Sequence, residues 1–376
     1  MRIVAVSTAY PMRGGMAHYM ALLYRTLVQR GHEVRVISFS RQYPGLLFPG
    51  KTQTDLSRDV EAIPSEAVLD SINPFSWLRS ASRARSFSPD VLLLNYWMPF
   101  FMPAYATVAC LVRLFSRTRV IFLCHNIVPH ERRLGDRLFT RVGLRTAHGF
   151  VVQTEAVRDD LLRARADAKY RLVSLPAFDL FKTSLSRGEA RERLGLDPKD
   201  RVVLFFGYVR RYKGLGVLLQ AMRTVRESMA VKLVVAGEFY EDVVSTERSI
   251  QELGIAKDVL MFDEYIPNED VGTYFAAADV VTLPYLSATQ SGILQISYNF
   301  DTPVIVSDVG GLAESVIEGK TGFVVPPGDG AALAQAIIRF FQRSPTEDFA
   351  ARVREYKTQF SWDRMAEAVE SLAADL

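Results

Sequence analysis

The chain has 376 residues, of which 49% are hydrophobic and 23% charged, a composition typical of a soluble globular protein. This length exceeds one comfortable hydrophobic core, so two domains of roughly 180 residues are expected. The two cysteines, Cys110 and Cys124, argue against a disulfide framework and favour a reducing, cytoplasmic compartment.

Two apolar stretches raise the question of a membrane or a leader segment. Residues 1–7 are too short an apolar run for a signal peptide and are followed by no cleavage site, so they predict a buried strand. Residues 91–112 are apolar, but Asn95, Pro99 and Pro103 interrupt them. A strand, a loop and a buried helix explain this stretch, and no membrane-spanning segment is expected.

The net charge of +3 conceals an asymmetry between the two halves of the chain. Residues 1–180 carry 24 basic and 14 acidic side chains, a balance of +10, and residues 181–376 carry 21 and 28, a balance of −7. A basic half joined to an acidic half indicates that the first half meets an anionic partner. A nucleic acid is not among the expected partners.

The first forty residues predict a βαβ unit of a parallel sheet, with strands at 1–7 and 33–39 and a helix at about 16–30. The first loop contains Gly14 and Gly15, which permit close backbone approach to a ligand; an ordinary tight turn is the alternative. The loop lacks G-x-G-x-x-G, and no acidic residue ends the second strand, so a nicotinamide-dinucleotide site is not expected.

His125 follows a predicted strand at 119–123 and therefore lies at the carboxyl edge of the sheet, where α/β enzymes place functional groups. A structural histidine satisfied by the backbone is an equally weighted alternative. His130 and Glu131 follow closely, but neither cysteine pairs nor repeated histidines support a zinc site, so no metal is expected. Three further strands are predicted in this half, at 91–94, 149–152 and 171–175.

The apolar runs of the first half are followed by a polar stretch that we interpret as a linker between domains. The predicted organisation is a first domain at 1–180, a linker at 181–200, a second domain at 201–355 and a C-terminal helix at 356–376 that returns to the first domain. The pattern of buried strands restarts after the linker, at 202–207, 232–237, 259–262, 279–284, 302–306 and 321–325.

Three loops of the second half come at the carboxyl ends of predicted strands: 207–214, 289–292 and 308–311. The first contains cations, and the second opens a short helix at Ser291, a residue suited to capping. Cations and a helix N-terminus both stabilise negative charge without a metal, so together they predict a clamp for a diphosphate. An ordinary capped helix is the alternative for the second loop alone. Two Rossmann-like halves with such a clamp predict a nucleotide-diphosphate-sugar enzyme.

Three groups of residues in this half resemble the retaining glycosyltransferases of family 4, which have the GT-B fold. They are Phe206-Gly207 with Lys213-Gly214; Ala278-Asp279 with Leu283-Pro284; and Thr302-Pro303-Val304-Ile305-Val306-Ser307-Asp308-Val309-Gly310-Gly311 with Glu314, Gly319 and Gly322. The glycine loop of the first half and His125 match acceptor-side features of the family, so the resemblance covers nearly the whole chain.

The resemblance implies an α/β fold of two Rossmann-like, doubly wound domains with a cleft between them. It implies a hexosyltransferase-type enzyme that moves a sugar, with retention of configuration and without a metal or other cofactor, from a UDP- or GDP-linked donor to a glycan or lipid-linked acceptor in polysaccharide or glycolipid biosynthesis. Catalytic roles fall to His125, Lys213, Arg210 and Arg211. Donor-binding roles fall to Gly207, Thr289, Gln290, Ser291, Gly292, Gly310, Gly311 and Glu314, and acceptor-side roles to Gly14, Gly15 and His18.

Two departures mark the chain as a divergent member of the family. The usual Glu, seven residues, Glu pattern is replaced by Ala288 and Ile296, and Tyr208 stands where an arginine normally follows the motif glycine. Arg210 or Arg211 would supply the missing cation. The alternative function is a catalytically silent GT-B protein that binds sugar nucleotides or supports a partner enzyme. A GT-B epimerase would need acid–base carboxylates facing the sugar, and no convincing set is present.

Four arginines of the first half recur every fourth residue: Arg133, Arg137, Arg141 and Arg145. On a helix they line one face, beside an apolar stripe that includes Leu138 and Val142. This pattern is typical of helices that rest on anionic membranes. We therefore expect peripheral association with the inner face of a membrane. The alternatives are a solvated charged face and apolar residues that face the core.

Overall fold

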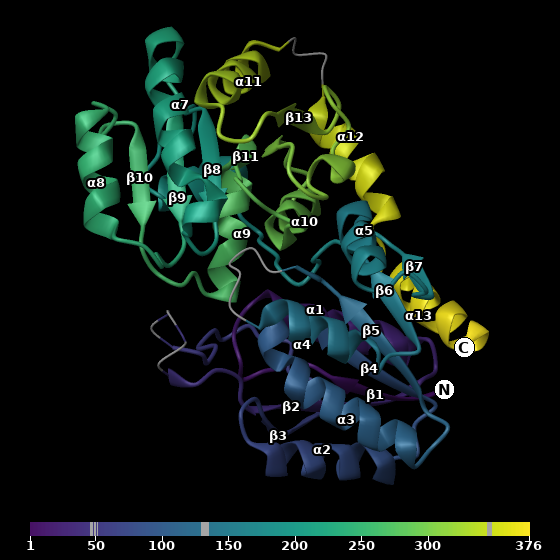
Figure 1. Ribbon diagram of the computed structural model, residues 1–376. Coiled ribbons are helices and arrows are strands. Elements are labelled where there is room, and N and C mark those ends of the chain that lie inside the picture. Colours follow the sequence, from purple (N-terminus) through teal and green to yellow (C-terminus); the bar gives the residue numbers. More distant parts are fainter. Residues whose placement is uncertain (46–47, 49, 51, 129–134, 344–347) are drawn as a thin grey trace. The chain divides into compact units, whose positions relative to one another are not determined.

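The computed structural model describes residues 1–45, 48, 50, 52–128, 135–343 and 348–376, and it divides into two compact units. Unit 1 comprises residues 1–55, 60–176 and 360–376, and unit 2 comprises residues 56–59 and 177–359. Each unit contains its own parallel sheet and its own hydrophobic core (Figure 1).

The sheet of unit 1 has seven parallel strands in the order β3-β2-β1-β4-β5-β6-β7. In chain order they are β1 (Arg2–Val6), β2 (Glu33–Arg41), β3 (Ser65–Asp70), β4 (Val91–Tyr96), β5 (Arg119–Cys124), β6 (Gly149–Val152) and β7 (Tyr170–Leu172). The connecting elements are α1 (Gly15–Gln29), α2 (Pro74–Ser86), η2 (Pro99–Phe101), α3 (Met102–Leu114), α4 (Asp136–Leu144) and α5 (Glu155–Ala164), followed at the end of the chain by α13 (Trp362–Asp375).

The strands of unit 1 follow the apolar runs of the sequence, as β4 illustrates. All six of its residues are buried, because helices cover both faces of a parallel sheet and leave no exposed face for polar side chains. Helices α2, α3 and α4 pack side by side, while α1 packs on α13 (Figure 1). The strands predicted at 91–94, 119–123 and 149–152 are confirmed. The edge strand β3 was not predicted, because only one of its six residues is buried and its pattern is weak.

Helix α13 completes unit 1 although it comes at the other end of the chain. The Trp362 ring meets the Tyr19 ring of α1 edge-on, with ring centres 4.9 Å apart. Arg30, which follows α1, forms an ion pair of 2.8 Å with Glu370, and His32 approaches the same carboxylate at 2.7 Å. The last helix is therefore held by both apolar and ionic contacts.

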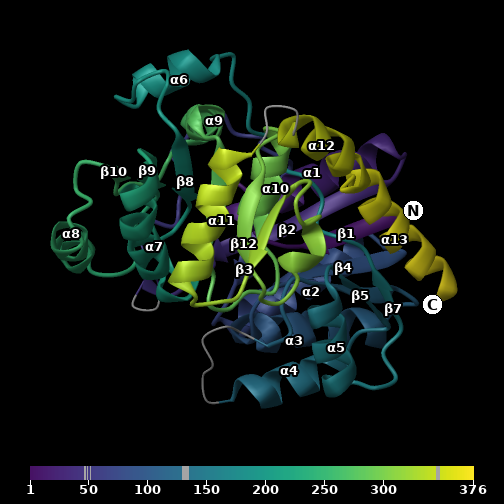
Figure 2. The same ribbon diagram turned by 90° about the horizontal axis from the view of Figure 1, so that it is seen from above.

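The sheet of unit 2 has six parallel strands in the order β10-β9-β8-β11-β12-β13. The strands are β8 (Val202–Phe206), β9 (Lys232–Ala236), β10 (Val259–Phe262), β11 (Val280–Leu283), β12 (Val304–Ser307) and β13 (Gly322–Val325). The helices are α6 (Arg187–Arg193), η3 (Arg211–Lys213), α7 (Leu215–Ser228), α8 (Val243–Glu252), α9 (Asn268–Ala277), α10 (Gly292–Asn299), η4 (Ala313–Ser315), α11 (Gly330–Gln342), α12 (Phe349–Tyr356) and η5 (Lys357–Gln359). Helices α7 and α11 pack side by side over the sheet (Figure 2). All six predicted strands of this half are present.

A short segment from the first half of the chain, residues 56–59, belongs to unit 2. The backbone N–H of Asn268 donates to the Ser57 hydroxyl at 3.0 Å, and the backbone N–H groups of Arg58 and Asp59 donate to the Glu269 carboxylate. These bonds attach the segment to the start of α9. No local pattern in the sequence indicates this attachment, because the partners are more than 200 residues apart.

Candidate functional site

In unit 2, the loop after β8 and the start of α10 meet at Gly207. Gly207 has a φ of +94°, and a Cβ placed on it would lie 3.1 Å from the Lys213 ammonium and 3.2 Å from a side-chain carbon of Ile293. A side chain at this position would therefore crowd both neighbours, and the left-handed backbone also favours glycine. The glycine lets the Lys213 ammonium lie close to the first turn of α10, as the predicted clamp requires.

The Lys213 side chain is buried, with 7% of the residue exposed. Burial, and secondarily the charge of Arg210, lowers the pKa of the Lys213 ammonium to about 7. Among the described residues no carboxylate forms an ion pair with it, and the Tyr285 ring centre lies 5.7 Å away. A buried cation without an acidic partner is costly, and an anionic ligand would remove that cost. This is the feature of unit 2 that points most directly to an anion.

The two neighbouring arginines differ in their surroundings. The Arg210 guanidinium lies over the Tyr240 ring at 4.8 Å from its centre and is close enough to affect the Lys213 ammonium. The Arg211 side chain is exposed on η3. Of the two arginines predicted to act with Lys213, Arg210 is therefore the one that lies near it. Tyr208, predicted to stand in place of the family's arginine, stacks on Tyr240 with ring centres 4.9 Å apart.

Helix α10 starts after Ser291, as predicted, but the Ser291 hydroxyl does not cap it. That hydroxyl lies 3.4 Å from the Tyr285 hydroxyl instead. The backbone N–H groups of the first turn therefore donate no bond to the Ser291 side chain, which leaves them able to bind an anion. Gly292 opens the helix, and a Cβ there would only touch the Phe178 ring at 3.7 Å.

The loop after β12 packs on the loop that precedes α10. The Gly311 N–H donates to the Thr289 carbonyl at 2.9 Å. Gly310 has a φ of +52°, and a Cβ there would lie 1.9 Å from the Ala288 carbonyl oxygen. The paired glycines thus allow the two loops to touch, and Thr289 is buried between them and the helix start.

The remaining candidates of unit 2 differ in exposure. Gln290 is half-buried, and Glu314 is exposed on η4 beyond the glycines. Ala288 and Ile296, predicted to stand in place of the family's two glutamates, are both buried. Glu238 was missed by sequence reasoning: it follows β9 and is 2% exposed, and an acidic residue after a strand-ending glycine, Gly237, was the available signal.

In unit 1, the glycine loop and the first histidine lie at the start of α1. Gly14 has a φ of +107° and precedes the helix, and Gly15 is its first residue, exposed and with open space around its Cα. No side chain caps this helix start. His18 lies half-buried on the first turn, where burial lowers its pKa and the Asp55 carboxylate opposes that effect.

His125 follows β5, as predicted, and its buried ring contacts the side chains of Asn95 and Tyr19. The Asn95 amide nitrogen donates to the Ser7 hydroxyl at 2.8 Å, so the Asn95 oxygen faces His125 Nε2, 2.6 Å away. This arrangement assigns the proton to Nε2. The Tyr19 ring meets the imidazole edge-on at 4.6 Å, and its hydroxyl accepts a bond from Gln153 at 2.9 Å.

Burial lowers the pKa of His125 to about 3, and a hydrogen bond with Gln153 partly opposes that effect. The imidazole is therefore neutral across the physiological range. A neutral ring suits orientation of a ligand by hydrogen bonding, and it does not suit a role as a general acid. Sequence reasoning identified the histidine and missed its partners, because Asn95 lies in β4 and Gln153 follows β6, both far from His125 in the sequence.

The described residues contain no group of three or more histidine, cysteine or acidic side chains placed to hold a metal ion. His130 and Glu131 lie outside the described residues. No helix in the described part of the chain is long and apolar enough to cross a membrane.

Comparison with known proteins identifies relatives over both units. The family model "Glycosyltransferase Family 4" matches residues 13–175, and "Glycosyl transferases group 1" matches residues 200–343. Among curated proteins, a D-inositol 3-phosphate glycosyltransferase of Corynebacterium diphtheriae is 25% identical over 96% of this chain and 90% of its own length. The enzyme of the same name from Geodermatophilus obscurus is 28% identical over 96% of this chain and 84% of its own length.

Solved structures share the fold at lower identity. The Anabaena protein HepE, in complex with UDP and glucose, superposes with a TM-score of 0.80 at 18% identity, and the similarity covers all of both chains. Sucrose-phosphate synthase from Thermosynechococcus elongatus gives a TM-score of 0.73 at 21% identity over 100% of this chain and 98% of its own. With two parallel-sheet, Rossmann-like units, each matched by a glycosyltransferase model, the chain belongs to glycosyltransferase family 4 and is a glycosyltransferase with the GT-B fold.

Proposed function

We propose that this enzyme transfers a sugar from a nucleotide-diphosphate donor, UDP- or GDP-linked, to a glycan or lipid-linked acceptor, with retention of anomeric configuration. The observation that carries the proposal is the buried Lys213 ammonium, which lies beside the start of α10 without a carboxylate partner in the described chain. HepE, of the same fold, is known in complex with UDP and glucose, and this supports a nucleotide-sugar donor.

The proposed reaction breaks the bond between the anomeric carbon and an oxygen of the β-phosphate. The acceptor hydroxyl oxygen forms the new bond to that carbon, on the same face, and its proton passes to the departing diphosphate. Negative charge therefore grows on the diphosphate as the bond breaks. Lys213, with Arg210 and the first N–H groups of α10, stabilises this charge more strongly in the transition state than in the bound donor.

On the acceptor side, we assign orienting roles to the glycine loop and the neutral His125. The first turn of α1 has no side-chain cap, and no acidic side chain lies in it, so it favours a negatively charged or hydroxyl-rich group. Burial keeps the His125 ring neutral, and we assign it the role of positioning the Asn95 and Gln153 side chains through its hydrogen bonds with them. This role needs no metal, and we propose a metal-independent reaction.

The test is release of nucleotide across a panel of UDP-, GDP- and ADP-sugars, with membrane extract as acceptor. Lys213→Ala should lower kcat by on the order of a hundredfold while the protein stays folded, because the leaving diphosphate loses charge stabilisation. Arg211→Ala is the matched control, since its side chain is exposed. If the unaltered enzyme turns over none of the donors, the chain is better explained as a catalytically silent protein that binds sugar nucleotides. If Lys213→Ala has an unaltered rate, the assignment of Lys213 to a diphosphate clamp is wrong.

We further propose that the enzyme works at the inner face of a membrane, on a precursor of a polysaccharide or glycolipid. The apolar residues of α4 do not face the core: Leu138, Phe139 and Val142 are 64%, 45% and 54% exposed. Arg137 and Arg141 are exposed beside them, whereas Arg133 lies outside the described residues. An exposed face that is both cationic and apolar suits an anionic membrane surface.

Co-sedimentation with phosphatidylglycerol vesicles at low and high salt tests this proposal. Leu138→Ser with Val142→Ser, and separately Arg137→Glu with Arg141→Glu, should each lower binding several-fold. Val28→Ser with Val244→Ser is the control, because these valines are 43% and 59% exposed on other helices. Equal binding by all variants would leave α4 as an ordinary solvated helix.

A further inference from the structure

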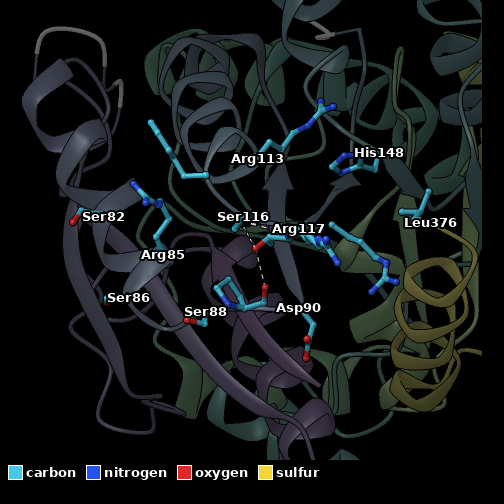
Figure 3. A pocket seen from close by; sticks show the side chains of 14 residues that line it. Ser82, Arg85, Ser86, Ser88, Asp90, Arg113, Ser116, Arg117, His148 and Leu376 are labelled. Carbon is cyan, nitrogen blue, oxygen red and sulfur yellow. Dashed lines mark hydrogen bonds between the residues drawn. The ribbon is translucent and has the colours of Figure 1, made fainter.

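A wide pocket of about 1010 Å³ lies in unit 1, at the amino ends of three strands of the sheet. Its lining comes from the end of α2, the end of α3 and the residues that lead into β4, β5 and β6 (Figure 3).

Four arginines and one histidine dominate this lining, and we call them the basic basin: Arg85, Arg113, Arg117, Arg119 and His148. Asp90 is the acidic side chain among the lining residues, and its carboxylate already accepts the backbone N–H of Arg2 at 2.7 Å. Within the described part of the chain, no ion pair is recorded for any of the four guanidinium groups. Like charges in one pocket repel each other, so this arrangement favours an anionic occupant.

The individual side chains differ in how they are held. The Arg113 guanidinium donates to the Thr146 carbonyl at 2.7 Å, and Arg85 lies over the Phe115 ring at 4.4 Å. Both are thereby fixed at the pocket while most of their donors stay available. No hydrogen bond from the guanidinium of Arg117 or Arg119 is recorded to any described residue. An arginine presents a planar fork of donors that matches phosphate oxygens.

His148 adds a directed donor at one end of the basin, next to Arg113 (Figure 3). The backbone N–H of Val120 donates to His148 Nδ1 at 2.8 Å, so the neutral ring carries its proton on Nε2. Burial, and secondarily the charges of Arg113, Arg165 and Arg119, lowers the pKa of His148. An anion in the basin would oppose that effect, which makes the ring a local reporter.

The basin is separate from the candidate site of unit 1. Arg119 is the first residue of β5 and His125 directly follows its last, so the strand separates them by about 20 Å. We propose that the basic basin binds a phosphate-bearing ligand, either a phosphomonoester or a diphosphate group, at the sheet edge opposite His125. The ligand is held by the Arg85, Arg117 and Arg119 forks and by His148 Nε2. Neither the sugar-transfer reaction nor the family assignment requires this site.

The test is a titration with inorganic pyrophosphate, followed through the ring resonances of His148, which His148→Gln assigns. Pyrophosphate should shift them, and Arg117→Gln with Arg119→Gln should raise the apparent Kd at least about tenfold. Arg223→Gln with Arg248→Gln is the matched control, because both arginines are exposed on α7 and α8 of unit 2. If the first double variant does not fold, Arg85→Gln with Arg117→Gln replaces it, since both are exposed.

Pyrophosphate would also occupy the proposed diphosphate clamp, so the titration is repeated in Lys213→Ala. The His148 shift should persist there, which separates this site from the proposed function. Vesicles of phosphatidylcholine with phosphatidic acid then distinguish a lipid headgroup from a free phosphate. Binding to those vesicles that the Arg117/Arg119 variant loses assigns a lipid source, and a pyrophosphate shift without vesicle binding assigns a soluble one. The proposal is overturned if pyrophosphate leaves the His148 resonances unshifted and if, in addition, the protein does not bind the vesicles or the Arg117/Arg119 variant binds them as well as the unaltered protein does.

Discussion

Lys213 links the burial of one side chain to the pH dependence of the enzyme. Its ammonium has a pKa of about 7 in the folded protein. Above that pH the free enzyme holds a neutral amine, which cannot stabilise a diphosphate, so kcat/KM should fall by up to tenfold per pH unit above about 7. The kcat should change less, because a bound anion raises the pKa again.

Two variants test whether Lys213 causes the alkaline limb of the pH profile, that is, the fall in kcat/KM above about pH 7. Arg210→Gln removes a repelling charge and should move the limb to higher pH. Lys213→Arg keeps a charge at all accessible pH values and should flatten the limb, although at a lower rate because fork and point charge differ in geometry. A limb that stays in place in both variants would assign the titration to another group.

His125 predicts a contribution to acid sensitivity. Its folded pKa of about 3 lies below the ordinary value of 6.5. Between those values the unfolded chain takes up a proton that the folded chain does not, so stability present above about pH 6.5 is lost as the pH falls. From pH 7 to pH 4.5 the loss through this one residue should be about 2–3 kcal/mol.

His125→Gln should remove that part of the acid sensitivity while keeping a side chain able to bond Asn95. The measurement is urea unfolding of both proteins at pH 7 and pH 4.5. The variant should lose less stability than the unaltered chain over this interval. Equal losses would mean that the ring is not shielded from solvent as the structure shows.

At the scale of elements, the start of α10 decides whether the helix binds an anion or only packs. Gly292 has room for a Cβ, 3.7 Å from the nearest ring carbon of Phe178, so Gly292→Ala should leave the unfolding free energy unchanged or slightly higher. The added methyl group still obstructs close approach of a phosphate to the helix N–H groups. Affinity for UDP should therefore fall about tenfold, as measured by calorimetry.

Gly216→Ala is the control for this substitution. Gly216 is exposed in the first turn of α7, and a Cβ there would have no neighbouring atom within 4 Å. Gly216→Ala gives the same gain in helix propensity at a helix start that is not proposed to bind the nucleotide. Equal UDP affinity in Gly292→Ala and Gly216→Ala would show that the start of α10 does not bind the nucleotide and that the helix only packs in unit 2.

At the scale of the whole molecule, α13 stabilises unit 1 through ion pairs with the residue that follows α1. The Arg30 guanidinium, and secondarily the His32 ring, lowers the pKa of the Glu370 carboxyl to about 2, although burial opposes this. Because the folded pKa lies below the ordinary 4.5, the stabilisation is fully present above about pH 4.5 and is lost as the pH falls towards 2.

Glu370→Gln should therefore lower the unfolding free energy at pH 7 by about 1–2 kcal/mol, allowing for a carboxylate that is one quarter exposed. The difference should shrink as the pH is lowered below 4. Glu367→Gln is the control, because Glu367 is 60% exposed and 3.7 Å from Arg30. Similar effects of the two substitutions would show that Glu370 contributes no more than a surface pair.

The sequence by itself determined the parallel character of both sheets, most of their strands and the family. Strands that are buried on both faces must be apolar along their length, so runs such as 91–94 and 202–206 can be recognised as buried strands from the sequence. Gly207 with Lys213, and Gly310 with Gly311, were predicted as site residues for a related reason, since glycines and cations in the loops after such strands stand out locally.

Tertiary structure alone decided what depends on residues far apart in the chain. The attachment of residues 56–59 to α9, the Asn95 contact of His125 and the grouping of Arg85, Arg117 and His148 in one basin join segments with no common local pattern. The exposure of Leu138 was likewise undecided, because the same helical spacing suits a core face and a surface face. Periodicity reports which residues share a face, and only packing determines what that face meets.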